Sequence, residues 1–400
     1  MKIESNNGVL TVYFEGDLDA QNASSIQAEI EAAKNAHPDD NILFDAENLR
    51  YISSAGLRVL LKFVRAAKGK EVVIQNVSRD VYDVLELTRF VDLMTVKKKL
   101  REISVDGCEV IGKGRSSSVY RTDPETIVKL YTDGVPLEKI EQEIDLAKKA
   151  FVVGIPTAIS YDLVRCGDVY GVVFEMIAHA DTVGRTITAH PDQFDEITEK
   201  FVDTYKIIHS TDIKEFGGFH SLKETWHKWA DGMSTAFTAE ETALLHKMID
   251  TIPERSTMVH CDFHAGNVMY QEGQIVVIDM ADIGYGHPIF DLAGNAFHAR
   301  YSGSATRQKV HGMTQENMLR FWDKLLTLYF NIKDDETLAK VKEMCDAFGL
   351  LRGALFPMKH RQIAPELKAF HVEETRKNLF PRIDWALAEA ARLDEYFAKA

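Results

Sequence analysis

The densest group of chemically capable side chains lies between Val259 and Gly284, in VHCDFHAGNVMYQEGQIVVIDMADIG. The carboxylate of Asp262 is followed five positions later by the amide of Asn267, and Asp279 follows a short apolar run. Mg²⁺ prefers a few oxygen ligands completed by phosphates and water. These residues therefore indicate a site in which Asp262 orients a hydroxyl and accepts its proton, while Asn267 and Asp279 hold a divalent cation. Such a layout suits phosphoryl transfer, which needs mainly positioning and charge neutralisation.

A second group of residues, earlier in the chain, supplies what that layout lacks. The segment GKGRSSSV, Gly112–Val119, follows a strand pattern, and its backbone N–H groups could fold over phosphates. Lys129 lies in the middle of the predicted strand TIVKLY, where an unpaired ammonium group is costly. Glu143, on the next predicted helix, could pair with Lys129 and aim it at the phosphates. The two groups together predict a site for a phosphate-bearing ligand and a metal ion.

The histidines beside Asp262 leave a rival interpretation open. His260, Asp262 and His264 could form the metal cluster of a hydrolase. No further histidine-rich ligand set follows, and the cluster would leave Lys129 and Glu143 without a role, so this interpretation is disfavoured. As structural residues, His260 would brace the loop and His264 would pack or hydrogen-bond within it.

The order of these residues resembles that of kinase-like phosphotransferases, specifically the aminoglycoside phosphotransferase and choline kinase-like family. The resemblance covers about residues 106–400 and is closest from Met258 to Gly294. It implies an α+β, two-lobed protein-kinase-like domain, with an N-lobe at 106–178 and a C-lobe at 179–400. It also implies ATP and Mg²⁺ as cofactors, and a hydroxyl of a small molecule as the phosphoryl acceptor.

The resemblance further implies a role for individual residues. Asp262 would be the catalytic base, and Asn267 and Asp279 the Mg²⁺ ligands. Asp291 would brace the catalytic loop, while Asp282 is left as either a second metal contact or a substrate contact. The residues implied to hold the nucleotide are Gly112 and Gly114 of the phosphate loop, Lys129 with its partner Glu143, and the hinge from Glu175 to Ile177.

The first hundred residues carry a different pattern, in which strands alternate with helices. Apolar residues alternate through residues 9–16, and short buried strands are predicted at 41–46 and 71–77. Helices are predicted between and after them, at 19–36, 53–70 and 78–90. This alternation predicts an α/β domain, residues 1–105, whose sheet is wholly or partly parallel.

The segment FDAENLRYISSAGLRVLLKF, Phe44–Phe63, resembles the signature of STAS domains, the fold of anti-sigma-factor antagonists. In that family a serine at the start of a helix is phosphorylated by a partner kinase. Alignment on the glycine of SSAG places Ala55 where that serine usually lies, so Ser54 or Ser53 would have to substitute. The alternative is that both serines only cap the helix.

Composition and charge limit the partners and the cellular location that the sequence predicts. The 47 Lys and Arg residues against 61 Asp and Glu give a net charge of −14, which argues against a nucleic-acid partner. No apolar run is long enough to span a membrane, and the start MKIESNNGVL does not resemble a signal peptide. The four cysteines form no CxxC pair, so reduced thiols and a cytoplasmic location are expected.

Two interpretations of the whole chain remain. The first is an ATP- and Mg²⁺-dependent phosphotransferase with an amino-terminal STAS domain for regulation or protein docking. The second is a signalling adaptor of the anti-sigma-factor-antagonist type, whose kinase-like domain senses nucleotide or phosphorylates a protein serine. The acceptor pocket is expected among the carboxy-terminal helices, for example 221–237, where Trp226 and Trp229 could stack on a ligand, although packing is favoured for both.

Overall fold

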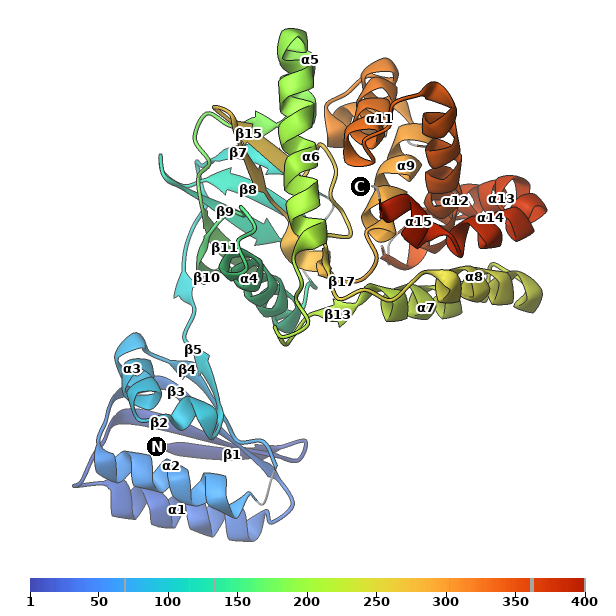
Figure 1. The fold of residues 1–400 in the computed structure, drawn as a ribbon. Coiled ribbons are helices and arrows are strands. Elements are labelled where there is room, and N and C mark those ends of the chain that lie inside the picture. Colours follow the sequence, from blue (N-terminus) through green and yellow to red (C-terminus); the bar gives the residue numbers. More distant parts are fainter. Residues whose placement is uncertain (68–69, 115, 133, 302, 360–362, 399–400) are drawn as a thin grey trace. The chain divides into compact units, whose positions relative to one another are not determined.

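The computed structural model describes residues 1–67, 70–114, 116–132, 134–301, 303–359 and 363–398. It contains two compact units (Figure 1). The amino-terminal unit comprises Met1–Ser104 and Leu163–Asp168, and the carboxy-terminal unit comprises Val105–Asp162 and Val169–Ala400.

The amino-terminal unit is built on a five-stranded sheet of order β1-β2-β3-β4-β5. Its strands are β1 (Lys2–Asn6), β2 (Val9–Leu18), β3 (Asn41–Ile52), β4 (Val73–Val77) and β5 (Thr95–Lys98). The β1–β2 pair is antiparallel, and the other three pairs are parallel. Its helices are α1 (Ala23–Ala36), α2 (Ser54–Ala66), α3 (Arg79–Leu87) and the 3₁₀ turn η1 (Phe90–Asp92). The α/β fold with a largely parallel sheet, predicted from the sequence, is confirmed.

Apolar periodicity explains how this unit closes. Leu10, Val12 and Phe14 alternate along β2 and are fully buried. Phe14 stacks on Phe44 of β3 with ring centroids 5.5 Å apart. Helices α1 and α2 lie side by side against the sheet (Figure 1). A short β6 (Arg101–Glu102) ends the unit and pairs in parallel with residues 164–165 of β10 (Ser160–Cys166).

The smaller lobe of the carboxy-terminal unit consists of antiparallel strands and one helix. The strands are β7 (Glu109–Lys113), β8 (Ser117–Arg121), β9 (Thr126–Tyr131) and β11 (Val169–Glu175), with β9 between β8 and β11. Helix α4 (Leu137–Val152) buries Ile140, Glu143 and Leu146 on one face. Predicted strands 108–134 and the predicted helix 137–154 coincide with these elements.

The larger lobe is mostly helical and encloses a small β region. Its β elements are β12 (Asp181–Thr182), β13 (His220–Ser221), β14 (Met258–Val259), β15 (Val268–Gln271), β16 (Gln274–Val277) and β17 (Gly284–Tyr285), with the 3₁₀ turn η3 (Met280–Asp282). Its longer helices are α5 (Val183–Ala189), α6 (Phe194–Ser210), α7 (Leu222–Gly232), α8 (Ala239–Thr251), α9 (Ile289–Tyr301), α11 (Gln315–Tyr329), α12 (Asp335–Lys359), α13 (Pro365–Asn378) and α14 (Ile383–Ala390). Shorter turns are η2 (Pro191–Gln193), α10 (Ser304–Thr306), η4 (Arg307–His311), η5 (Phe380–Arg382) and α15 (Leu393–Phe397).

Helix α12 runs through the middle of this lobe and packs along α9. Its residues from Met344 to Leu355 are buried without interruption, so the helix is enclosed on all sides there. Two glycines of α12 allow the close approach, since a Cβ at Gly353 would lie 2.7 Å from the ring of Phe297. Within the described residues no helix is both long and apolar enough to cross a membrane.

Candidate active site

The predicted metal ligands are brought together by a β-hairpin. Strands β15 and β16 pair with Val268 opposite Val277, and Ile278 N donates to Asn267 O over 3.0 Å. Asn267 therefore precedes the hairpin and Asp279 follows it at the same open end. The sequence predicted a loop and one strand here, and the structure adds β15 as the second strand. Asp279 adopts a left-handed conformation with φ of 65°, which turns the chain sharply away from β16.

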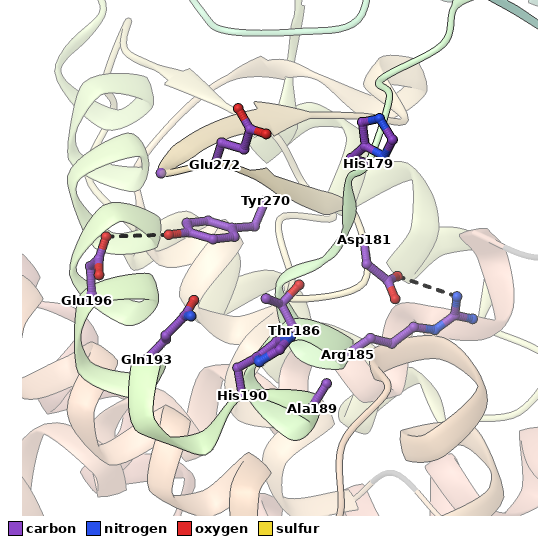
Figure 2. A pocket seen from close by; sticks show the side chains of 11 residues that line it. His179, Asp181, Arg185, Thr186, Ala189, His190, Gln193, Glu196, Tyr270 and Glu272 are labelled. Carbon is purple, nitrogen blue, oxygen red and sulfur yellow. Dashed lines mark hydrogen bonds and ion pairs between the residues drawn. The ribbon is translucent and has the colours of Figure 1, made fainter. Parts of the chain in front are cut away.

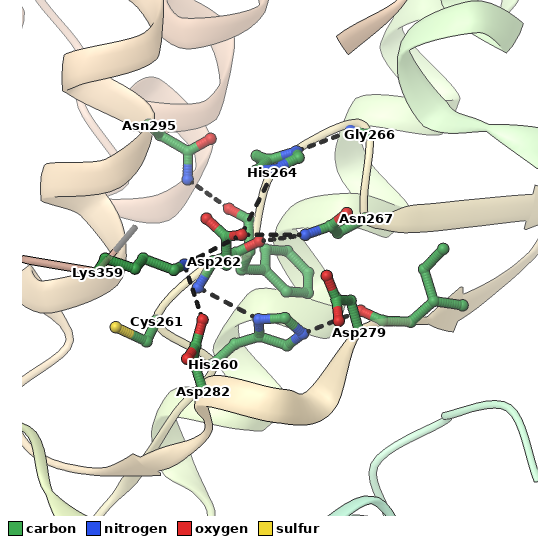
Figure 3. A network of polar contacts seen from close by, with 12 residues as sticks. His260, Cys261, Asp262, His264, Gly266, Asn267, Asp279, Asp282, Asn295 and Lys359 are labelled. Atoms are coloured by element: carbon green, nitrogen blue, oxygen red, sulfur yellow. Dashed lines mark hydrogen bonds and ion pairs between the residues drawn. The ribbon is translucent and has the colours of Figure 1, made fainter. Parts of the chain in front are cut away.

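Asp262 lies on the loop between β14 and β15, with its carboxylate held at one oxygen (Figure 3). Oδ2 is 3.2 Å from Lys359 Nζ, 3.4 Å from Asn267 Nδ2 and 4.0 Å from His264 Nε2. Burial raises the pKa of Asp262, but the positive charges around it, with Lys359 the largest, together outweigh burial and hold this pKa well below its usual value. The carboxylate is therefore ionised at neutral pH, as a proton acceptor must be.

Lys129 joins the two lobes of the carboxy-terminal unit through ion pairs. It lies on β9 between Val119 of β8 and Val172 of β11. Its Nζ is 2.6 Å from Glu143 Oε1 on α4 and 3.2 Å from Asp279 Oδ1. Burial lowers the pKa of Lys129, but the two carboxylates outweigh burial and raise it, so the group stays charged. Residues 129, 143 and 279, predicted to converge, thus form one cluster.

The predicted phosphate loop is the turn between β7 and β8. Gly112 is opposite Val119, and Gly114 N donates to Ser117 O over 2.9 Å. A Cβ on either glycine would meet its nearest neighbour at 3.4–3.5 Å, an ordinary contact. The hairpin itself therefore does not require glycine at these positions. Arg115, in the same predicted loop, lies outside the described residues.

The predicted hinge follows β11. Glu175 is tied to the segment before β10, since its backbone N–H donates to Ile159 O and its Oε1 accepts from Ile159 N. Met176 N donates to Glu125 O over 2.7 Å. Ile177 O accepts from Ala180 N over 3.4 Å as the chain turns into the larger lobe. These hydrogen bonds therefore fix the backbone conformation of the segment.

The histidines of the catalytic loop act as hydrogen-bonding braces. His260 Nδ1 accepts from Asp262 N, and its Nε2 faces Ile278 O at 3.2 Å. His264 Nδ1 accepts from Gly266 N, so the proton of the neutral ring is on Nε2, facing Asp262. Burial lowers the pKa of His264, which favours that neutral ring.

These hydrogen bonds bear on the rival metal cluster. Asp262, His264 and His298 offer ligand atoms within 4.8 Å of one another. A neutral imidazole has one free lone pair, and in both His260 and His264 that lone pair accepts a backbone N–H. Neither ring can bind a metal without first giving up that bond, so the geometry favours the bracing roles.

Asp291 on α9 holds the loop that carries Asp262 through a backbone hydrogen bond. Its Oδ2 accepts from His260 N over 3.0 Å and lies 3.1 Å from His209 Nε2. One turn later, Asn295 Nδ2 donates to Phe263 O over 2.7 Å. The side chain of Asp291 is fully buried and cannot reach a substrate. Its placement matches the bracing role implied for it.

Other residues singled out from the sequence have simpler environments. Asp282 pairs with Lys359 at 2.8 Å. Trp226 is fully buried against Phe290, so packing explains it. Trp229 is partly buried, with the Arg352 guanidinium carbon 5.5 Å from its ring centre.

Two cations of α12, Lys359 and Arg352, contact the loop that carries Asp262, and the sequence analysis did not predict them. Lys359 contacts Asp262 itself, and Arg352 Nη2 donates to Cys261 O over 3.4 Å. Nothing in the local pattern near residues 352–359 points to a loop some ninety positions earlier. The usable signal in the sequence was their place in a largely apolar helical stretch, because a charged residue that such a helix buries is costly unless it is paired.

In the amino-terminal unit, the two candidate serines differ in position. Ser53 is the N-cap of α2, and its Oγ accepts from Ala55 N at 3.1 Å and Gly56 N at 3.4 Å. Ser54 is exposed on the first turn of the helix. Ser53 therefore has the structural role that the sequence favoured, while the hydroxyl of Ser54 is accessible.

A pocket of about 570 Å³ lies away from this cluster (Figure 2). It is lined by polar groups of α5, α6 and the turn of the β15–β16 hairpin, including Glu196, Tyr270 and Glu272. Because Asn267 and Asp279 occupy the opposite, open end of that hairpin, this pocket is separate from the predicted metal site.

The two-lobed fold and the meeting of Lys129 with Asp279 define the class: the carboxy-terminal unit is a kinase-like phosphotransferase. The pattern of the phosphotransferase enzyme family (APH) matches residues 107–312, and that of the STAS domain matches residues 1–103. The chain belongs to the phosphotransferase enzyme family and carries an amino-terminal STAS domain, as the sequence predicted.

Individual relatives match one or the other part. A protein of Bordetella bronchiseptica that bears the name anti-sigma factor antagonist BtrV is 31% identical over 99 residues, 24% of this chain and 84% of that protein. The anti-sigma F factor antagonist of Paenibacillus polymyxa is 25% identical over 99 residues, with the same shares.

Solved structures with a similar fold have low sequence identity to this chain. A choline/ethanolamine kinase family protein from Mesorhizobium loti is 12% identical, with a TM-score of 0.49 over 71% of this chain and 92% of that one. The gentamicin complex of APH(2")-IIa is 16% identical, with a TM-score of 0.48 over 76% of this chain and 97% of that one.

Proposed function

We propose that the chain transfers the γ-phosphoryl group of ATP, with Mg²⁺, to a hydroxyl of a small molecule. The observation that carries this proposal is the position of Lys129, within ion-pair distance of both Glu143 and Asp279. An ammonium group held between the two lobes is placed to contact nucleotide phosphates, and phosphoryl transfer depends on such positioning. Some structures of similar fold are complexes with ATP or ADP, which supports a nucleotide here.

The residues at the open end of the hairpin fit a divalent cation. The amide nitrogen of Asn267 donates to Asp262 O over 3.1 Å, which leaves its carbonyl oxygen as a free ligand. Asp279 adds a carboxylate that is about half exposed, at 44%. Two oxygen ligands from the protein, completed by phosphates and water, are what Mg²⁺ requires. When bound, the ion would neutralise charge on the nucleotide phosphates.

Asp262 then serves as the base. The acceptor hydroxyl gives its proton to the Asp262 carboxylate as its oxygen forms a bond to the γ-phosphorus. The bond from that phosphorus to the β–γ bridging oxygen breaks, and ADP leaves. Lys129 holds the phosphates, Glu143 holds Lys129, and the turn that carries Gly112 and Gly114 lies over the phosphates, although the Gly114 N–H is itself bonded to Ser117 O. The hinge from Glu175 to Ile177 meets the adenine.

The test of this proposal is a panel of hydroxyl-bearing small molecules, including amino sugars and amino alcohols, incubated with γ-labelled ATP and Mg²⁺. We expect label to move to at least one acceptor, with no transfer when Mg²⁺ is chelated. Transfer that is unaffected by chelation would contradict the metal assignment. Labelled product is read by mass spectrometry, which also identifies the hydroxyl that reacted.

The STAS domain favours a second role, docking of a protein partner. Two relatives of this domain are named as anti-sigma factor antagonists, and Ser54 is exposed at the start of α2. A helix start favours a dianion, and a phosphate there would change the charge of a docking surface. The adaptor interpretation extends this role to the whole chain, with the kinase-like domain as its sensor or as the kinase of a protein serine.

Phosphorylation of the serine distinguishes the adaptor interpretation. If the kinase-like domain acts on the STAS domain, intact-mass measurement after incubation with Mg-ATP should show one added phosphate in the wild type and none in Ser54→Ala. The Ser25→Ala variant, which changes an exposed serine of α1, serves as the control. An unchanged wild-type mass would count against a protein-serine target within the chain. We place both roles in the cytoplasm, where four free thiols remain reduced.

A further inference from the structure

Helix α12 presents two buried cations to the catalytic loop. Arg352 and Lys359 are seven positions apart, two helical turns, and so share one face. Arg352 is 3% exposed, and the side chain of Lys359 is 7% exposed. An ammonium group buried to this extent is costly unless carboxylates compensate it. Lys359 therefore sits where it does because of the acidic groups around it.

Lys359 bridges two of those acidic groups (Figure 3). Its Nζ lies 3.2 Å from Asp262 Oδ2 and 2.8 Å from Asp282 Oδ2. Two carboxylates that approach one cation from different segments restrict its position more than one would, because each removes a direction in which the flexible side chain could move. Asp282, on η3, thus fixes where Lys359 meets Asp262.

The side-chain contacts of the Asp262 carboxylate meet at one of its two oxygens. Lys359, Asn267 and His264 all approach Oδ2. A carboxylate held at one oxygen is fixed in rotation and presents the other oxygen in a defined direction. The base proposed above would thus have one anchoring oxygen and one reacting oxygen.

We propose that Lys359 is a positioning residue for Asp262: bridged to Asp282, it anchors Oδ2 and leaves Oδ1 to receive the proton of the acceptor. This inference rests on the proposed function of Asp262. The family pattern ends at residue 312, so the anchoring cation comes from a helix beyond the matched segment. Helix α12 is then part of the catalytic apparatus as well as of the core.

The first test uses the full-length chain with Mg-ATP and water as the acceptor, because ATP hydrolysis needs no identified substrate. In Lys359→Met we expect kcat to fall about 10- to 100-fold, the usual effect of removing a group that orients a ligand or a base. Affinity for Mg-ADP should stay within about twofold, and Lys359→Arg should recover most of the rate. Lys342→Met is the matched control, because it removes another cation of α12, one that pairs with Asp323 of α11, and it should leave the rate unchanged.

A second comparison separates positioning from structural support. If Lys359 acts through Asp262, adding Lys359→Met to Asp262→Asn should cause no further loss of rate. An equal loss in both backgrounds would overturn the proposal. If the Lys359→Met variant does not fold, the double variant Lys359→Met with Asp282→Asn takes its place in the comparison. The double variant removes a cation and an anion together.

A crystallographic test does not depend on turnover. If the wild type hydrolyses no ATP and phosphorylates no acceptor, the proposed function fails, but the geometry can still be measured. Crystal structures of the wild type and Lys359→Met with Mg-ADP should show the Asp262 carboxylate rotated away from its wild-type direction in the variant. An unchanged carboxylate would overturn the positioning role of Lys359.

Discussion

Replacement of Asp262 by asparagine should lower kcat for phosphoryl transfer by about 10²- to 10⁴-fold, the usual contribution of a general base. Asparagine keeps the size of the side chain and can still contact Lys359, but it cannot take a proton at neutral pH. The KM for ATP should change little, because the nucleotide contacts proposed here are made by other residues. Initial rates with the acceptor found in the panel, or with water, provide the measurement.

The Asp262→Asn result needs a control for simple loss of charge. Asp195 pairs with Lys324 at 3.0 Å, and its side chain is 65% exposed. Asp195→Asn removes the same charge at the surface and should leave the rate unchanged. A variant of Asp262 that retains most of its activity would show that another group accepts the proton, and would remove the basis for the Lys359 inference as well.

Replacement of Lys129 by methionine should weaken the use of ATP. Hydrogen bonds to charged groups contribute about 1.5–3 kcal/mol, so their loss should lower kcat/KM for ATP about 10- to 150-fold. The expected defect is in nucleotide binding as well as in rate, which separates this variant from Asp262→Asn. Calorimetric titration of each variant with Mg-ADP should show the weaker binding.

Loss of stability could imitate that result, because methionine leaves the buried Glu143 without its partner. Breaking a buried ion pair by removing one member costs about 3–5 kcal/mol. The pair Lys129→Met with Glu143→Leu removes both charges and should recover stability in thermal unfolding, while nucleotide binding stays weak. Lys149→Met, at a more exposed pair with Asp145 on the same α4, is the matched control. Restored binding in the double variant would contradict a phosphate contact by Lys129.

The comparison of sequence and structure shows which elements carry a local signal. Strands β2, β3 and β4 were predicted because their apolar residues are buried by the helices that follow them. The edge strands β1 and β5 were missed, since KIESN and TVKK are polar and owe their extended form to backbone pairing with a neighbour. Strands β10 and β15 were missed for the same reason, because SYDLVRC and VMYQ contain too few buried residues to show a period.

The sequence by itself was enough to identify the two domains and the residue types for phosphoryl transfer. Residues that share a loop or a hairpin are close in the chain as well as in space, so their spacing can be read from the sequence. It placed Asp262, Asn267 and Asp279 in one segment and named Lys129 with Glu143 as a pair. Only the tertiary structure could decide that Lys359 and Arg352 meet that segment. Their contact depends on how α12 packs along α9, and such packing is set by the shapes of many distant side chains rather than by any local pattern.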